Sequence, residues 1–345
     1  MNRHLVTLIC ITLPVVLLVI AAELIDDRLL TRLATTLCIN MILVLGLQIF
    51  TGNSGILSFA HIGFMGIGAY TSAVITMPAR LKSMALPELY PIMQGVQLDP
   101  LVGMAIGGVV AALVAAIVAY PLMRLSDAAA VITSFALLMI LHTIMVHWSE
   151  VTNGPRTLFG IVEATTLQLA AAAAVVAAIG AYWFKESRVG ILLRAVRNDE
   201  VAAAAIGAHI PLLRWRAYVL SAFYAGIGGA LWAHFITSFS PNAFYLRETF
   251  VILGMLVIGG PATVSGAVFG VFSVTAVFEG LRALEKAINA ADLFSSTVVG
   301  LTEIILALVM LIVLILRPGG IIERNEFGTL ARWPFMKKQN SSRGE

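Results

Sequence analysis

RVGILLRAVRNDEVAAAAIGAHIPLLRWR, residues 188–216, is the long polar interruption in this apolar chain that can carry a helix of its own. From Lys185 to Arg216, six lysines and arginines stand against three acidic residues, and strongly apolar runs flank both ends. Loops between membrane spans that are rich in Lys and Arg stay on the cytoplasmic side. The stretch 185–216 therefore predicts a cytoplasmic loop that sets the orientation of the chain.

A short helix is expected inside this loop. Asn198 or Asp199 can cap it, and the carboxylates of Asp199 and Glu200 favour its first turn. Gly207 and then Pro211 end it. About two turns of helix are only marginally stable in water, so we expect the segment to rest on another surface. It is either a connector that is solvated or lies among the lipid headgroups, or a coupling helix that inserts into a groove on a soluble partner.

Composition predicts a membrane protein. The chain has 345 residues, of which 59% are hydrophobic and 12% charged, against about 25% charged in an average soluble domain. Many windows of about 20 apolar residues are long enough to cross a hydrocarbon layer of about 30 Å. We therefore expect an all-α polytopic integral membrane protein. The net charge of +3 is concentrated in the central loop and the C-terminal tail, which is typical of membrane topology and not of nucleic-acid binding.

Hydropathy predicts ten spans, some of them interrupted, and charge sets their direction. Six spans before the central loop put Arg3 in the cytoplasm, and four spans after it put the tail, residues 317–345, on the same side. Both termini are then cytoplasmic. The expected spans are about 5–22, 29–50, 56–77, 101–121, 127–147, 165–184, 217–238, 247–260, 264–284 and 297–316.

Two glycine-rich segments interrupt the helical pattern, Thr51–Tyr70 and Gly254–Gly270. Non-helical backbone at membrane depth is tolerated where protein buries it or a cavity is adjacent, and interrupted segments in both halves of a transporter point to a pathway. The same glycines also suit structural helices that pack closely, and His61 also suits a hydrogen-bonded structural role. The candidate translocation path consists of Gln48, Asn53, Ser54, Gly55, His61, Gly259 and Gly260.

Catalytic and nucleotide-binding motifs are missing from the sequence. No G-x-x-x-x-G-K-[ST] occurs, so the chain does not bind ATP through a P-loop. No H-E-x-x-H or G-x-S-x-G occurs either, which leaves a protease or hydrolase without a motif. Cys10 and Cys38 lie in apolar runs and suit packing better than a metal site. We expect a transport subunit without catalytic or metal-binding residues, and not an enzyme.

Three blocks carry a family likeness: SGILSFAHIGFMGIGAY (54–70), RAVRNDEVAAAAIGAHIPLLRWRAYVLSAFYAGIGGALWAHF (194–235) and RPGGI (317–321). Together they resemble the permease subunits of bacterial branched-chain amino acid ABC importers, LivM type, over roughly residues 40–322. The resemblance implies a plasma (inner) membrane core shared with a second permease of the LivH type. It also implies two cytoplasmic ATPases, which bind the ATP and Mg, and a periplasmic solute-binding protein; no cofactor is implied in this chain.

In such a complex the loop 185–216 contacts an ATPase. Its expected contact residues are Arg194, Arg197, Asp199, Glu200, Ala203 and Gly207. The alanine-rich face around Ala203 is expected to enter a groove, and the two arginines to pair with acids on the ATPase or with lipid phosphates.

The sequence also departs from the family pattern. Gly260-Pro261-Ala262 stands where Gly-Gly-Met-Gly is usual, and Asn153 where Gly is common. These departures leave the solute class open among branched-chain amino acids, other amino acids, urea and amides. A stand-alone secondary carrier is the alternative mechanism, although no span carries the paired acids expected of a proton-driven device.

Overall fold

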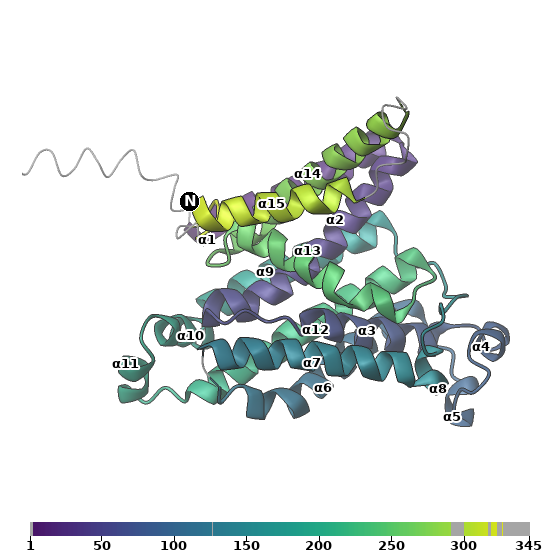
Figure 1. The fold of residues 1–345 in the computed structure, drawn as a ribbon, viewed down its shortest axis with the longest axis horizontal. Helices are drawn as coiled ribbons and strands as arrows, with labels where there is room; N and C mark the ends of the chain where they lie inside the picture. The colour runs from purple at the N-terminus through teal and green to yellow at the C-terminus, as the bar shows by residue number, and fades with distance from the viewer. Residues whose placement is uncertain (1–2, 126, 291–299, 317–318, 323–325, 327–345) are drawn as a thin grey trace, which may run out of the picture. The chain divides into compact units, whose positions relative to one another are not determined.

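The computed structural model describes residues 3–125, 127–290, 300–316, 319–322 and 326, and these residues are almost entirely helical (Figure 1). The only β-pairing among them is one isolated bridge between Leu158 and Phe239. The helices are α1 Arg3–Ile25, α2 Arg28–Leu47, α3 His61–Thr76, α4 Ala79–Ala85, α5 Pro91–Gln94, α6 Pro100–Leu122, α7 Asp127–His147, α8 Ser149–Thr152, α9 Leu167–Glu186, α10 Arg188–Asn198, α11 Glu200–Ala205, α12 Ile210–Ile236, α13 Leu246–Gly259, α14 Val264–Ala290 and α15 Leu301–Leu316, with the π-helix η1 Gln48–Gly52 and the 3-10 helix η2 Pro241–Phe244. The expected all-α polytopic fold class is confirmed.

Within the described part of the chain, eight helical segments are long and apolar enough to cross a membrane. Two of the ten expected spans, 56–77 and 297–316, are not among them. α3 has 16 residues, which at 1.5 Å per residue gives about 24 Å, less than the hydrocarbon thickness of about 30 Å. The span 297–316 begins at residues that lie outside the described part of the chain, where α15 is described from Leu301 to Leu316. The eight are Val6–Ile25, Arg28–Gly52, Pro100–Leu122, Ala128–His147, Leu167–Glu186, Ile210–Ile236, Pro241–Gly259 and Val264–Asn289.

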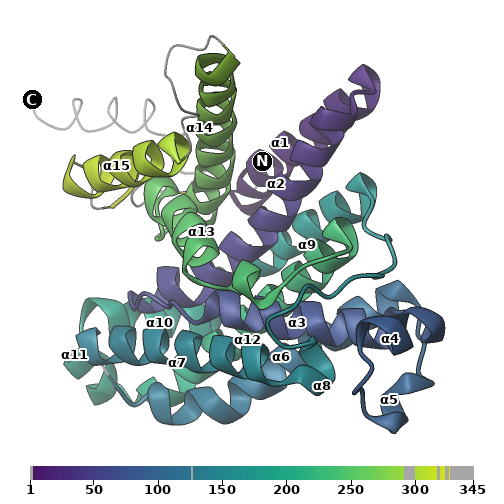
Figure 2. The same ribbon diagram turned by 45° about the vertical axis from the view of Figure 1, so that its right-hand side comes forward.

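The chain forms two compact units. The larger unit is Val15–Leu253, and the smaller unit combines residues 1–14 with residues 254–345. Within the larger unit, α10 and α11 lie at one end, and α4, α5 and α8 lie at the opposite end (Figure 1). The turned view in Figure 2 shows the same separation. The expected tail, residues 317–345, lies outside the described residues except for 319–322 and 326.

Close packing of α3 against α12 forms the centre of the larger unit. A Cβ atom added to Gly229 of α12 would lie 2.0 Å from the backbone oxygen of Met65 in α3. A Cβ atom added to Gly68 of α3 would lie 2.2 Å from the backbone oxygen of Gly226 in α12. Small residues at such positions let two helix backbones touch, which replaces the missing hydrophobic driving force inside a membrane.

A serine–histidine hydrogen bond lies on each side of this glycine contact. Ser221 Oγ lies 3.1 Å from His61 Nδ1, and Ser72 Oγ lies 2.9 Å from His234 Nε2. The second ring nitrogen of His61 donates to the Leu43 carbonyl at 3.0 Å, because a carbonyl oxygen can only accept. Both nitrogens of the buried His61 therefore have partners on α2 and α12, which favours its structural interpretation over a place on the path.

Lys82 holds together the segment that joins α3 to α6. Its side chain is buried, and Nζ donates to the carbonyls of Met93, at 3.1 Å, and Val96. Burial lowers the pKa of the Lys82 ammonium from its usual value, because desolvation disfavours the charged form. The lysine therefore ties α4 to the turn that follows α5.

Replacing Lys82 with methionine should loosen this segment. Methionine keeps the volume of the side chain but leaves two carbonyls without their donor, at a cost of about 1–3 kcal/mol. We expect a protease added to the side of the membrane on which residues 86–98 lie to cleave them faster in this variant than in the unmodified protein. Arg80→Met, at an exposed position on the same helix, is the control. Equal cleavage rates for the two variants would contradict the role of Lys82.

Candidate functional site

The polar loop that the sequence singles out folds as two helices joined by a single residue. In α10, the Ser187 side chain accepts from the amide of Gly190 at 3.2 Å, and Leu193 and Val196 are buried. The helix α10 was not expected from the sequence. Its signals were the serine cap and the spacing of small and apolar residues every three positions, which turns one face toward the protein.

The second helix, α11, has the caps that the sequence predicts. The Asp199 carboxylate accepts from the amides of Val201, at 2.9 Å, and Ala202, at 3.0 Å. At the other end, Gly207 has a φ of +85°, a left-handed conformation that glycine adopts without a steric penalty. The Gly207 amide bonds to the Ala204 carbonyl at 2.9 Å, which satisfies one of the last carbonyls of the helix.

α11 is attached to the start of α12 by an ion pair. The guanidinium of Arg214, a buried residue, contacts the Glu200 carboxylate in the first turn of α11. Arg214 also donates to the Leu125 carbonyl at 3.2 Å. Sequence analysis did not single out Arg214, because its partners lie 14 and 89 positions away along the chain. The six residues of α11 therefore do not depend on helix propensity alone.

One expectation for α11 is wrong. Ala203, expected to enter a groove on a partner, is only 3% exposed and faces this chain instead. The exposed apolar side chains are Val201, at 81%, and Ile206, at 74%. A helix of six residues with four consecutive alanines has no apolar stripe from which its buried side could be predicted.

The two arginines of α10 also bind in a different place from the one expected. Arg197 Nη1 donates to the Gly52 carbonyl at 2.6 Å, and Arg194 Nη1 donates to Asn53 Oδ1 at 3.4 Å. Arg194 additionally contacts the carbonyl of Lys185 at the end of α9. These contacts lie within the chain. They connect the loop to the first glycine-rich segment.

That segment is a genuine interruption of the helix. The π-helix η1 follows α2, and the side chains of Asn53 and Ser54 bond back to the carbonyls four residues earlier, at 2.9 and 2.8 Å. Gly55 then has a φ of +79°, and the chain stays non-helical until shortly before α3. The expected span 56–77 therefore begins as a helix only at His61.

A cavity of about 290 Å³ lies between the loop and this interruption. It is lined by Ser54, Gly55, Ile56, Leu57, Val131, Val196, Arg197, Asn198, Asp199, Glu200 and Arg214. Two groups of residues that the sequence assigned to separate roles, the candidate path and the candidate coupling loop, thus meet at one place.

Gln48, at the start of η1, is unusual in the described part of the chain. Its side chain is 0% exposed, and neither amide atom has a hydrogen-bond partner there. The buried hydroxyl of Thr51, in the same π-turn, has none either. Unsatisfied buried polar groups cost free energy, and π-turns occur often at functional sites. The unsatisfied side chains of Gln48 and Thr51 therefore raise the free energy of the π-turn, and the surrounding structure must offset it.

The second glycine-rich segment, in the smaller unit, is closed by the end of the chain. Gly260 has a φ of +118°, and the amides of Ile321 and Ile322 each donate at 3.0 Å to the carbonyls of Ile258 and Gly259 respectively. These two hydrogen bonds satisfy carbonyls in the last turn of α13. Gly259 and Gly260, expected on the path, thus lie at a turn to which residues 321 and 322 are hydrogen-bonded.

Glu326 completes this closure at the start of α14. Its carboxylate accepts from the amides of Val264 and Ser265, at 3.0 Å each, and from the Ser265 hydroxyl. A carboxylate at this position stabilises a helix by satisfying free amides and interacting with the helix dipole. No local pattern could have revealed Glu326, because 62 residues separate it from Val264.

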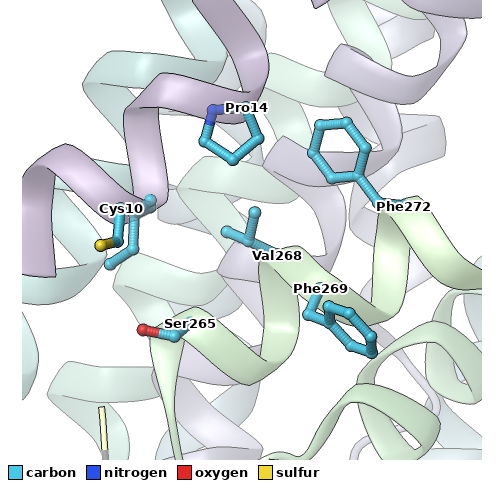
Figure 3. Close-up of a pocket in the computed structure, with 7 residues that line it drawn as sticks. Cys10, Pro14, Ser265, Val268, Phe269 and Phe272 are labelled. Atoms are coloured by element: carbon cyan, nitrogen blue, oxygen red, sulfur yellow. The ribbon is translucent and has the colours of Figure 1, made fainter. Parts of the chain in front are cut away.

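The smaller unit also contains an apolar pocket of about 120 Å³, between α1 and α14. Figure 3 shows Cys10 and Pro14 of α1 across from Val268 and Phe272 of α14. Sites for small molecules usually measure about 300–1,000 Å³ and contain several polar groups. This pocket has only the Ser265 hydroxyl, so it is a poor candidate for binding a polar solute.

Comparison with known proteins identifies the family. A family model described as "Branched-chain amino acid transport system / permease component" matches residues 29–314. The chain is 24% identical to the high-affinity branched-chain amino acid transport system permease protein LivM of Escherichia coli (strain K12), over 91% of this chain and 73% of that protein. LivM of Salmonella typhimurium is also 24% identical, over 84% of this chain and 69% of that protein.

A third relative is the nucleoside ABC transporter permease protein NupC of Lactococcus lactis subsp. cremoris, 31% identical over 31% of this chain and 35% of that protein. No solved structure matches the chain. The family match covers both the glycine-rich segments and the two-helix loop. The chain belongs to the family of permease components of branched-chain amino acid transport systems.

Proposed function

We propose that this chain is the LivM-type permease subunit of an ABC importer, which moves branched-chain amino acids or related small polar solutes into the cell. ATP hydrolysis on partner subunits drives the movement, and the chain itself holds no cofactor. The family match and the two LivM relatives support this proposal. It extends to a LivH-type second permease, two ATPases that bind ATP and Mg, and an extracytoplasmic solute-binding protein.

The observation that carries the proposal is the exposed apolar surface of α11. Val201 and Ile206, which together we call the docking pair, are 81% and 74% exposed. They lie on a capped helix within a basic loop, which the positive-inside rule assigns to the cytoplasm together with both termini. An apolar side chain in that position gains free energy when a soluble partner covers it. A stand-alone carrier has no use for such a surface.

The docking pair is tested by charge substitution. Val201→Arg combined with Ile206→Arg should reduce co-purification of the proposed ATPase subunits about tenfold or more, because burying an unpaired charge is costly. Ile92→Arg is the matched control. Ile92 is an 88% exposed isoleucine on α5, at the other end of the larger unit. Normal co-purification and transport by the double variant would sink the proposal.

The solute class is proposed from the relatives. Branched-chain amino acids come first, because the LivM relatives align over most of this chain. Nucleosides come second, because the likeness to the nucleoside permease covers only 31% of it. In importers of this kind the binding protein does most of the selecting. A ligand screen of the proposed solute-binding protein therefore distinguishes the two classes.

A further inference from the structure

Arg197 makes the central contact between the loop and the membrane helices. Its Nη1 donates to the carbonyl of Gly52, the last residue of η1, at 2.6 Å. Its aliphatic stem lies against Gly55, where an added Cβ atom would come within 2.7 Å of Arg197 Cγ. The arginine therefore contacts the helix interruption both with its charged end and with its stem.

Only a few residues of the chain connect the docking pair to Arg197. Only Asp199 separates α10 from α11. The Asp199 amide bonds to the Ala195 carbonyl at 3.0 Å, and its carboxylate caps α11. Ala203 is buried, so α11 packs against the rest of the chain. A displacement of α11 must therefore displace the end of α10, where Arg197 lies.

The element that receives this displacement, the π-turn η1, leaves two polar side chains unsatisfied in the arrangement that the structure shows. Gln48 and Thr51 are buried in the π-turn without hydrogen-bond partners among the described residues. Because these unsatisfied groups cost free energy, a second arrangement of the turn that gave them partners would be close to this one in free energy. Elements with two arrangements of similar free energy are those that a distant binding event can switch.

We propose that Arg197 transmits the movement of the docking helix α11 to the π-turn η1, with Arg194 as a second, weaker link through Asn53. This inference rests on the proposed importer function. We assign Arg197 as a positioning residue, because its contacts here are with the Gly52 carbonyl and with Gly55 of the helix interruption. Arginine suits the task, since its planar guanidinium stays charged and holds a carbonyl in fixed geometry, whereas lysine offers a flexible point charge.

Two substitutions distinguish the effect of the Arg197 guanidinium, which donates the hydrogen bond, from that of its aliphatic stem. Arg197→Met keeps an unbranched stem over Gly55 and removes the guanidinium, whereas Arg197→Lys keeps a positive charge. The reconstituted complex is assayed for ATPase co-purification and for the ratio of solute moved to ATP hydrolysed. We expect Arg197→Met to keep its ATPase subunits while that ratio falls about tenfold, within the range of coupling between distant sites. Arg197→Lys should recover part of the ratio.

The control is Arg188→Ala, an exposed position on the same helix, which should leave the ratio unchanged. An unchanged ratio in Arg197→Met overturns the inference. Loss of the ATPase subunits from Arg197→Met also overturns it, because Arg197 would then belong to the docking surface. If Arg197→Met does not fold, Arg197→Lys serves as the test instead. A lysine lacks the planar guanidinium, so an unchanged ratio of solute moved to ATP hydrolysed in Arg197→Lys would contradict the proposal. Failure of the docking-pair variant to release the ATPases counts against the importer function instead.

Discussion

Replacing Gly260 with alanine is expected to produce the largest loss of folded protein of any single change considered. At a φ of +118°, an alanine is strained, and its Cβ atom would lie 2.3 Å from the backbone oxygen of Ile322. That oxygen cannot rotate away, because the segment 319–322 is bonded to the end of α13. The chain end must therefore leave the turn, which exposes the free carbonyls of α13.

Gly300→Ala is the matched control for this prediction. Gly300 has a φ of +88°, but no atom of the described residues lies within 4 Å of an added Cβ atom. The Gly300→Ala variant is therefore destabilised only by backbone strain, about 1–2 kcal/mol. We expect a normal yield of monodisperse protein in detergent from Gly300→Ala and a severe loss from Gly260→Ala. Similar yields would mean that the chain end does not pack on the turn.

Replacing Gly229 with alanine should separate the two central helices of the larger unit. The new Cβ atom would lie 2.0 Å from the carbonyl oxygen of Met65, which belongs to the backbone of α3. Relief requires moving one helix by more than an ångström, and overpacking of this kind costs about 1–3 kcal/mol or more. The Ser72–His234 and Ser221–His61 hydrogen bonds would be stretched by the same movement.

A thermal unfolding series in detergent measures this effect. Gly280→Ala is the control, since Gly280 is a helical glycine in α14, and no atom in the described part of the chain lies within 4 Å of an added Cβ atom there. Alanine favours a helix over glycine by about 1 kcal/mol, so the control should unfold at the same temperature or slightly above it. The opposite order, with Gly229→Ala the more stable, would refute close contact between α3 and α12.

The interruptions at Gly55 and Gly260 were predictable, but their surroundings were not. Glycine density indicates where a backbone can leave the helix, and both residues do have positive φ. What closes each interruption comes from far along the chain. Arg197 reaches Gly52 across 145 positions, and Glu326 reaches Val264 across 62. For Gly260 the result is a sealed turn, whereas the sequence had suggested a path.

The sequence by itself determined the class of the protein, its family and the ends of the short helix α11. Hydropathy, charge placement and capping act between near neighbours or on whole segments, so they can be recognised without coordinates. Only the tertiary structure decided that Ala203 faces inward, that Val201 and Ile206 are exposed, and that both arginines of α10 bind the end of η1. The physical reason is that an alanine-rich helix of six residues has no preferred face, and an arginine binds whichever carbonyls the packing of distant helices brings within its reach.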